Sequence, residues 1–215
     1  RSISESSSES IIRGPKDSFT ENHSTNLGLI RKRIKDPNLV ITDLFLGKRT
    51  KTKVSTIYIK DIADTKKVNR ILEKLKQINV DGILDSGHIR EFLIRHQNTV
   101  FPKVISTERP DLACSSLLNG KIVIMVESTP YVLIIPAFFF DFFKNPEDYY
   151  QMPINISFTR ILRYLAFFIT IMAPAIYIAI TTFHIEMLPS SLLFSLYTQK
   201  FHVPFPTAFE VLLLM

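Results

Sequence analysis

The chain has 215 residues, of which 46% are hydrophobic and 21% are charged, and it carries a net charge of +6. In a single soluble globular domain, charged residues are usually spread over the whole chain. Their uneven distribution along this sequence therefore argues against that class. The chain opens on Arg1 and stops within an apolar run at Met215, and we therefore expect an internal fragment of a longer protein. Residues 151–215 contain only five charged side chains: Arg160, Arg163, Glu186, Lys200 and Glu210.

The first third of the chain predicts a linker, a helix and a β-hairpin. Residues 1–12 are rich in serine and too polar to bury a core, which predicts a flexible linker. Apolar residues at helical spacing from Asp17 predict a helix that Pro37 closes. Residues 39–46 and 54–59 have strand character, and the short segment between them predicts a hairpin.

The next elements alternate between helices and strands. Asp64 is a candidate N-cap for an amphipathic helix, and Asp85 or Ser86 caps another. A third helix runs from Arg109 to Leu118, and two apolar strands, 121–126 and 131–135, follow as a second, buried hairpin. We therefore assign residues 1–150 to an α/β (or α+β) domain and residues 151–215 to the start of a membrane domain.

Five phenylalanines crowd into residues 138–143, around Asp141. Such a cluster can belong to a protein core. It also precedes an apolar segment, which favours a surface that docks the soluble domain onto the membrane portion.

Residues 164–182 contain no charge, and as a helix they extend about 28 Å, close to the ~30 Å hydrocarbon core of a bilayer. They predict a transmembrane helix. Pro174 lies near its middle and is a candidate helix kink, either for packing or as a gating element. Arg160 and Arg163 are candidate membrane-boundary cations, and with Lys144 they favour a cytoplasmic position for residues 1–150 under the positive-inside rule.

Two further helices are predicted after this span. Residues 190–200 are too short to cross a bilayer and predict an interfacial helix, and residues 207–215 begin a second membrane helix. Glu210 is a candidate carboxylate of that helix. It fits an aqueous pathway, where ionisable groups at membrane depth are usually found, or a favourable position at the helix N-terminus.

No arrangement in the sequence points to catalysis, so we expect no enzyme, no cofactor and no metal site. The glycines form no phosphate-binding loop and the histidines have no metal-ligand spacing. Turn and capping roles account for Asp81 and Asp85, and burial accounts for Cys114 better than a nucleophilic role does. The basic runs 31–35 and 48–53 contain no aromatic residue and do not predict nucleic-acid binding.

Several strings of residues together resemble the A subunits of bacterial spore germinant receptors, the GerA family. The resemblance runs in consistent order along essentially the whole chain. The strings include residues 13–22, 30–34, 47–54, 81–87, 107–111, 147–150, 160–164 and 203–206.

The resemblance implies a protein of about twice this length, with a cytoplasmic N-terminal domain of two α/β subdomains followed by several membrane helices. It implies assembly in the spore inner membrane as a homo-oligomer, with a permease-like B subunit and a lipoprotein C subunit. Such a complex senses small-molecule germinants and triggers germination, with the A subunit thought to form a ligand-gated ion-conducting pore. It implies contact with membrane lipid and no nucleic-acid partner.

Two alternatives remain open at this point. The first is a membrane transporter subunit with a regulatory cytoplasmic domain, which suits the proline-broken apolar segments around Pro174 and residues 204–206. The second is a membrane-tethered basic module that binds anionic lipid or nucleic acid, and it rests on net charge alone.

Overall fold

The chain divides into two compact units, residues 1–151 and residues 152–215, and each is described by itself. The computed structural model describes residues 14–95, 101–144 and 153–187, together with the single positions 189, 194, 198 and 209. The predicted linker at residues 1–12 lies outside this part, as do most of residues 190–200 and 207–215.

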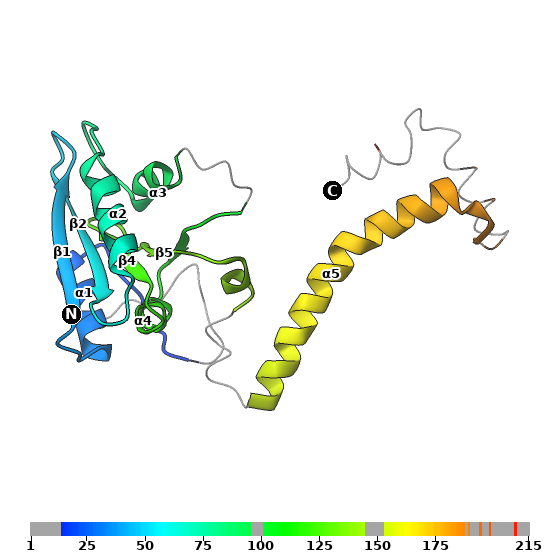
Figure 1. The fold of residues 1–215 in the computed structure, drawn as a ribbon, viewed down its shortest axis with the longest axis horizontal. Coiled ribbons are helices and arrows are strands. Elements are labelled where there is room, and N and C mark those ends of the chain that lie inside the picture. The colour runs from blue at the N-terminus through cyan, green and yellow to red at the C-terminus, as the bar shows by residue number, and fades with distance from the viewer. Residues whose placement is uncertain are drawn as a thin grey trace. The chain divides into compact units, whose positions relative to one another are not determined.

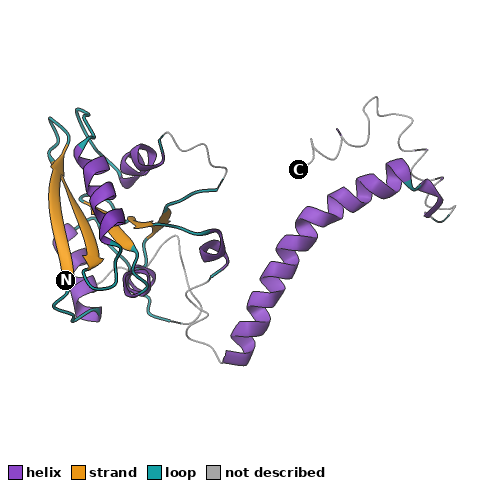
Figure 2. Cartoon of the chain, viewed as in Figure 1, coloured by secondary structure: helices purple, strands orange, loops and turns teal. Residues whose placement is uncertain are grey.

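The first unit is built on a five-stranded antiparallel sheet with the strand order β1-β2-β4-β5-β3 (Figures 1 and 2). The α/β (or α+β) fold class is thus confirmed. Two hydrophobic clusters lie on opposite faces of the sheet, one beneath α2 and α3 and the other beneath α1 and α4. The elements in chain order are α1 (His23–Arg33), β1 (Leu39–Leu46), β2 (Thr52–Ile59), α2 (Thr65–Lys76), α3 (Ser86–Ile94), β3 (Ile105–Thr107), α4 (Pro110–Leu118), β4 (Ile122–Val126), β5 (Val132–Ile135) and the short 3-10 helix η1 (Phe139–Phe143).

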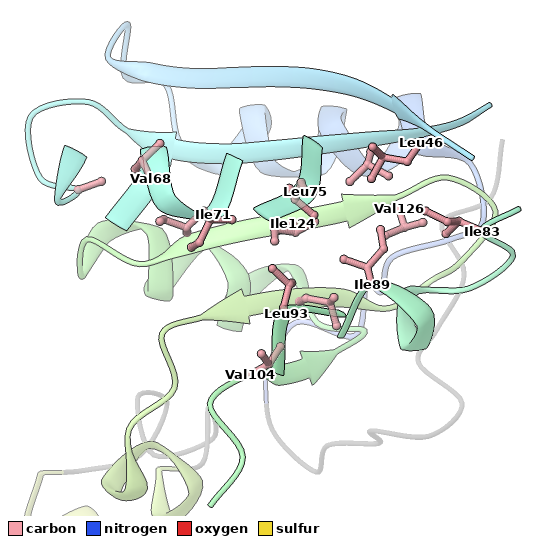
Figure 3. Close-up of a cluster of buried hydrophobic side chains, with 14 residues drawn as sticks. Leu46, Val68, Ile71, Leu75, Ile83, Ile89, Leu93, Val104, Ile124 and Val126 are labelled. Carbon is pink, nitrogen blue, oxygen red and sulfur yellow. The ribbon is translucent and has the colours of Figure 1, made fainter. Parts of the chain in front are cut away.

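Strand β4 forms the centre of the sheet, and all of its residues are buried. Ile122, Ile124 and Val126 face the cluster under α2 and α3, which Figure 3 shows. Val123 and Met125 alternate with them and face the cluster under α1 and α4. Because successive side chains of a strand point to opposite faces, an apolar run of this kind requires cover on both sides. The predicted central, two-sided burial of the second hairpin is confirmed.

Local sequence signals fix most element ends. Strands β1 and β2 pair from Leu39 opposite Ile59 to Leu46 opposite Thr52, as the predicted hairpin requires. Gly47 takes a φ of +87° at its turn, where a Cβ would lie 2.5 Å from Thr50 Oγ1, so only glycine fits. The Asp64 and Asp85 side chains accept from backbone N–H groups at the starts of α2 and α3, which confirms both caps.

Two elements of this unit differ from the sequence-based expectation. Helix α1 begins at His23 and not near Asp17, because the Asn22 side chain accepts from the N–H of Thr25 and starts the helix there. Strand β3 was not expected. It has only three residues and pairs with β5, too short a segment for alternation to be recognised.

The second unit contains one long helix, α5 (Pro153–Phe183, 31 residues), followed by the short 3-10 helix η3 (Ile185–Met187). Within the described residues, α5 is the one helix long and apolar enough to cross a membrane. It begins well before the predicted span 164–182, because Pro153 suits the first turn of a helix and residues 154–163 continue the pattern as an amphipathic extension.

A buried hydroxyl in the sheet provides a test of the packing. Thr56 Oγ1 lies in β2, fully buried, and has no hydrogen-bond partner. A buried unsatisfied hydroxyl costs about 1–3 kcal/mol, so we expect Thr56→Val to raise the free energy of unfolding by about 1 kcal/mol. Denaturant unfolding of the detergent-solubilised chain measures this difference. Thr42 lies directly opposite Thr56 on the edge strand β1 and is partly exposed, so Thr42→Val is the matched control. A Thr56→Val chain no more stable than the control chain would contradict this account of the core.

Candidate functional site

Four groups of side chains in the described residues merit assessment as functional sites. They are a polar network under α1, the ion pairs Arg33–Asp17 and Arg109–Asp111, the surface around Asp141, and helix α5 with its proline.

The polar network joins α1 to the β1–β2 hairpin through Ser55, which is fully buried. The Ser55 hydroxyl lies 2.8 Å from His23 Nε2, and it donates a short hydrogen bond to Asp43. Asp43 also pairs with Lys53, at 2.8 Å. Burial alone would raise the pKa of the Asp43 carboxyl, but hydrogen bonds from Lys53 and Ser55 outweigh that effect and hold its pKa below the usual range.

This network contains the serine, histidine and carboxylate of a hydrolytic triad, but its hydrogen bonds connect them in a different order. In a triad the histidine accepts the serine proton and the carboxylate holds the histidine. Here Ser55 donates to Asp43, so His23 must donate to Ser55 and cannot act as its base. The arrangement ties α1 to the sheet. Sequence reasoning missed it because His23 and Ser55 are far apart in the chain.

The two ion pairs lie in segments on which the family resemblance rests. Arg33 binds Asp17 with distances of 2.6 and 2.5 Å from Nη2 to the two carboxylate oxygens. Arg109 binds Asp111 through Nε at 3.0 Å and Nη2 at 2.6 Å, and both side chains are almost fully buried. The Phe19 N–H donates to the Glu108 carbonyl at 2.8 Å, which links residues 13–22 to residues 107–111.

The Phe19–Glu108 hydrogen bond holds residues 17–33 against the start of α4, while each ion pair stabilises its own region, so these contacts have a packing role. Cys114 lies in α4 close to the same charges. Burial raises the pKa of its thiol to about 11, so it stays protonated and is not a nucleophile. The burial expected for Cys114 is confirmed.

Asp141 accepts several hydrogen bonds within the first unit. It accepts from Lys121 Nζ at 2.7 Å, from Lys144 Nζ at 3.0 Å and from the Phe138 N–H at 2.8 Å. Burial alone would raise its pKa, but these three donors keep the pKa of the carboxyl below its ordinary value. The phenylalanines around it are not a core, because Phe138, Phe140 and Phe142 are exposed.

Two cavities lie in this unit. One, of about 390 Å³, lies between α2, α3 and the end of β5, and its polar lining is Lys67, Arg70, Lys74 and Lys103. The other, of about 470 Å³, lies between α4 and the Asp141 surface. In the ranges 14–95, 101–144 and 153–187, no group of three His, Cys, Asp or Glu side chains could hold a metal ion.

Helix α5 carries three of the residues singled out from the sequence. Pro174 lies inside the helix, and it cannot donate to the carbonyl of Thr170 one turn earlier. The helix curves along its length (Figure 1). The Thr170 hydroxyl donates to the Ala166 carbonyl at 2.7 Å, a pattern that often accompanies helix bending.

Arg160 and Arg163 lie in the amphipathic start of α5. At about 1.5 Å per residue, α5 is about 46 Å long, whereas the hydrocarbon core of a bilayer is only ~30 Å thick. A helix of this length exceeds the core thickness by about ten residues, and Arg160 and Arg163 are the eighth and eleventh residues of α5. Glu210, the fourth residue singled out, lies outside the described part of the chain.

The sequence model of the family described as "Bacillus/Clostridium GerA spore germination protein" matches residues 1–215. In Bacillus subtilis, spore germination protein B1 is 42% identical over 215 residues, which are 100% of this chain and 44% of that protein. Spore germination protein KA is 43% identical over 212 residues, covering 99% of this chain and 39% of that protein.

One further relative and one solved structure are also similar to the chain. The Bacillus subtilis protein named "Uncharacterized membrane protein YfkQ" is 37% identical over 214 residues, covering 100% of this chain and 42% of its own length. The crystal structure of the N-terminal domain of the A subunit of the Bacillus megaterium spore germinant receptor GerK3 is 46% identical in sequence. The match covers 57% of this chain and 97% of that one, with a TM-score of 0.46.

The polar network gives a pH-dependent prediction. Burial, together with the nearby Lys53 cation, lowers the pKa of His23, so the imidazole is neutral in the folded chain. The unfolded chain takes up this proton first as the pH falls through about 6.5, and the folded chain is then destabilised. Stability from His23 is therefore present above pH 6.5 and lost below it.

We expect unfolding experiments between pH 7.5 and 5 to show this loss. In the His23→Gln chain, which keeps a side-chain donor toward Ser55, the slope should be shallower, by less than about 1.4 kcal/mol per pH unit, the limit for one proton. The exposed His88 provides the comparison variant, His88→Gln, whose slope should stay that of the wild type. Equal slopes in all three chains would contradict the assignment.

Proposed function

The chain belongs to the Bacillus/Clostridium GerA family of spore germination proteins, and from this premise we propose that its protein acts as the A subunit of a spore germinant receptor. The observation that carries the proposal is the family match over residues 1–215, with relatives more than 40% identical along nearly the whole chain. The chain spans less than half the length of these curated relatives. Membership in this family agrees with the expectation that the chain is not an enzyme.

The proposed location is the inner membrane of the spore, with residues 1–150 on the cytoplasmic side and the protein crossing the membrane several times. Helix α5 supports a membrane location, since it is long and apolar enough to span a bilayer. Arg160 and Arg163 in its first turns support the orientation under the positive-inside rule.

The proposed partners are further A subunits, a permease-like B subunit and a lipoprotein C subunit. In this assembly the complex senses a small nutrient and responds by conducting ions. The interrupted hydrogen bonding at Pro174 supports a moving part, since the Thr170 carbonyl needs a partner from a neighbouring helix, a hydroxyl or water. Glu210 is proposed as a carboxylate of the pathway or of the interface.

Deletion of the gene in the spore-forming organism tests this function. We expect spores without the protein to lose their response to at least one nutrient germinant, measured as dipicolinic acid release, while release by high pressure or an exogenous chelate persists. A plasmid copy should restore the response. Spores whose response to every nutrient stays normal, in a strain without a second A subunit gene, would contradict the proposal.

A vesicle measurement separates the proposed ion conduction from the transporter alternative. In vesicles that contain the complete receptor, a germinant should open an ion conductance without accumulating inside. Accumulation of the germinant driven by an ion gradient, with no gated conductance, would favour a transporter subunit.

Pro174 provides a test within the helix. Pro174→Ala supplies the missing N–H, and removing a proline from a helix interior stabilises the straight helix by roughly 3 kcal/mol. We expect the germinant concentration for half-maximal response to shift at least several-fold while the receptor level in the membrane is unchanged. Ile176→Leu, an apolar exchange in the same turn, should leave the response as it was. Identical dose–response curves for all three proteins would exclude a gating role for Pro174.

A further inference from the structure

The last segment of the soluble unit before α5 presents aromatic side chains on its surface. Phe138, Phe140 and Phe142 are 57%, 60% and 48% exposed, whereas the neighbouring Phe139 and Phe143 are half-buried. Burying an aromatic side chain is strongly favourable, and a group of exposed ones marks a contact surface. Phe101, whose ring contacts Phe139, is also exposed, whereas the exposed Phe45 lies on β1 and the exposed Leu84 lies just before α3.

This aromatic surface is held in a defined shape. The Phe139 ring makes edge contacts with Phe101, Phe140 and Phe143, at centroid distances of 5.1, 5.6 and 5.1 Å. The N–H of Ala137 donates to the Lys103 carbonyl at 2.8 Å and joins the segment to the residues just before β3. The exposed rings therefore stand on an ordered base.

The charges around the rings are basic. Lys103 is exposed and the Lys144 side chain is about half-exposed. Asp141 is the carboxylate nearest the rings, and its side chain is 9% exposed with two lysines paired to it. Its charge is thus already compensated. The 390 Å³ cavity that begins at Lys103 and Pro136 adds Lys67, Arg70 and Lys74 to the same basic region.

The covalent chain limits how far this surface can lie from the start of helix α5. Residues 145–152 separate Lys144 from Pro153, and a fully extended chain of that length reaches about 30 Å. The aromatic surface is therefore tethered within the reach of a headgroup layer by the helix that would cross the bilayer. Aromatic rings flanked by lysines are the side chains that favour the membrane–water interface.

We propose that the surface formed by Phe138, Phe140, Phe142, Lys103 and Lys144 rests on the interfacial layer of the bilayer that α5 crosses, with the rings among the upper acyl chains and the lysines at anionic lipid phosphates. This inference rests on the membrane location in the proposed function. A lipid surface fits better than a second protein, because a phosphate-rich layer satisfies the lysines while the adjoining acyl region accepts the rings.

Three matched Phe→Trp variants test the proposal, because the chain contains no tryptophan. Each is made in the full 215-residue chain and inserted into vesicles of phosphatidylglycerol and phosphatidylcholine with or without brominated acyl chains. Phe142→Trp probes the surface. Phe168→Trp, at a position of α5 that is 60% exposed, reports whether that helix is inserted. Phe45→Trp, at the 70% exposed position on the far edge strand β1, is the control outside the surface.

We expect brominated lipid to remove about half of the emission of the Phe142→Trp and Phe168→Trp chains, since both tryptophans then lie within the bilayer or its interface. The Phe45→Trp chain should be unaffected by brominated lipid and quenched by aqueous iodide. Quenching of Phe168→Trp without quenching of Phe142→Trp would overturn the docking surface and leave the membrane location standing. An unquenched Phe168→Trp chain would overturn the membrane location, and the docking surface with it. Equal quenching of Phe142→Trp and Phe45→Trp would show non-specific adsorption and would also overturn the proposal.

Discussion

The two-sided burial of β4 is the constraint on which the first unit, residues 1–151, depends. Its alternating side chains belong to two separate hydrophobic clusters, so neither pair of helices can be removed without exposing half of the strand. This explains why residues 17–33 are tied down so firmly. The Arg33–Asp17 pair, the Phe19 N–H bond to the Glu108 carbonyl and the His23–Ser55 contact all keep α1 and its approach in place over one face of the sheet. Much of the sequence that marks the family thus maintains a layer of the fold.

The sequence predicts those elements whose signals are local. The first hairpin, the Asp64 and Asp85 caps and the burial of the second hairpin depend on residues a few positions apart, and the structure has each of them. Even the Asp43–Ser55 contact follows from the register, because these residues are directly opposite each other. The contact with His23 does not, since it depends on where α1 docks. Strand β3 offers too few residues for a pattern, and its pairing with β5 is decided by the tertiary fold.

The candidate sites divide in the same way. Pro174, Arg160 and Arg163 could be found from sequence because a proline within an apolar run and cations at its end are visible along the chain. The exposure of the rings beside Asp141 was favoured by their position before an apolar segment, but composition alone could not establish it, because a cluster of phenylalanines has the same composition in a core and on a surface. Two lysines compensate the charge of Asp141 beside these rings. One of them, Lys121, comes from the position just before β4. Only folding brings that charge to the segment before the membrane helix.

The unbroken run of α5 from Pro153 through its arginines has a mechanical consequence. A helix with a complete hydrogen-bond ladder resists bending and twisting, so a torque applied at Pro153 travels along the rod as a rigid-body rotation. The ladder loses its first interior rung between Pro174 and Thr170. Helix α5 therefore bends most easily about six turns from its start. A rotation applied at Pro153 changes the bend angle at that point.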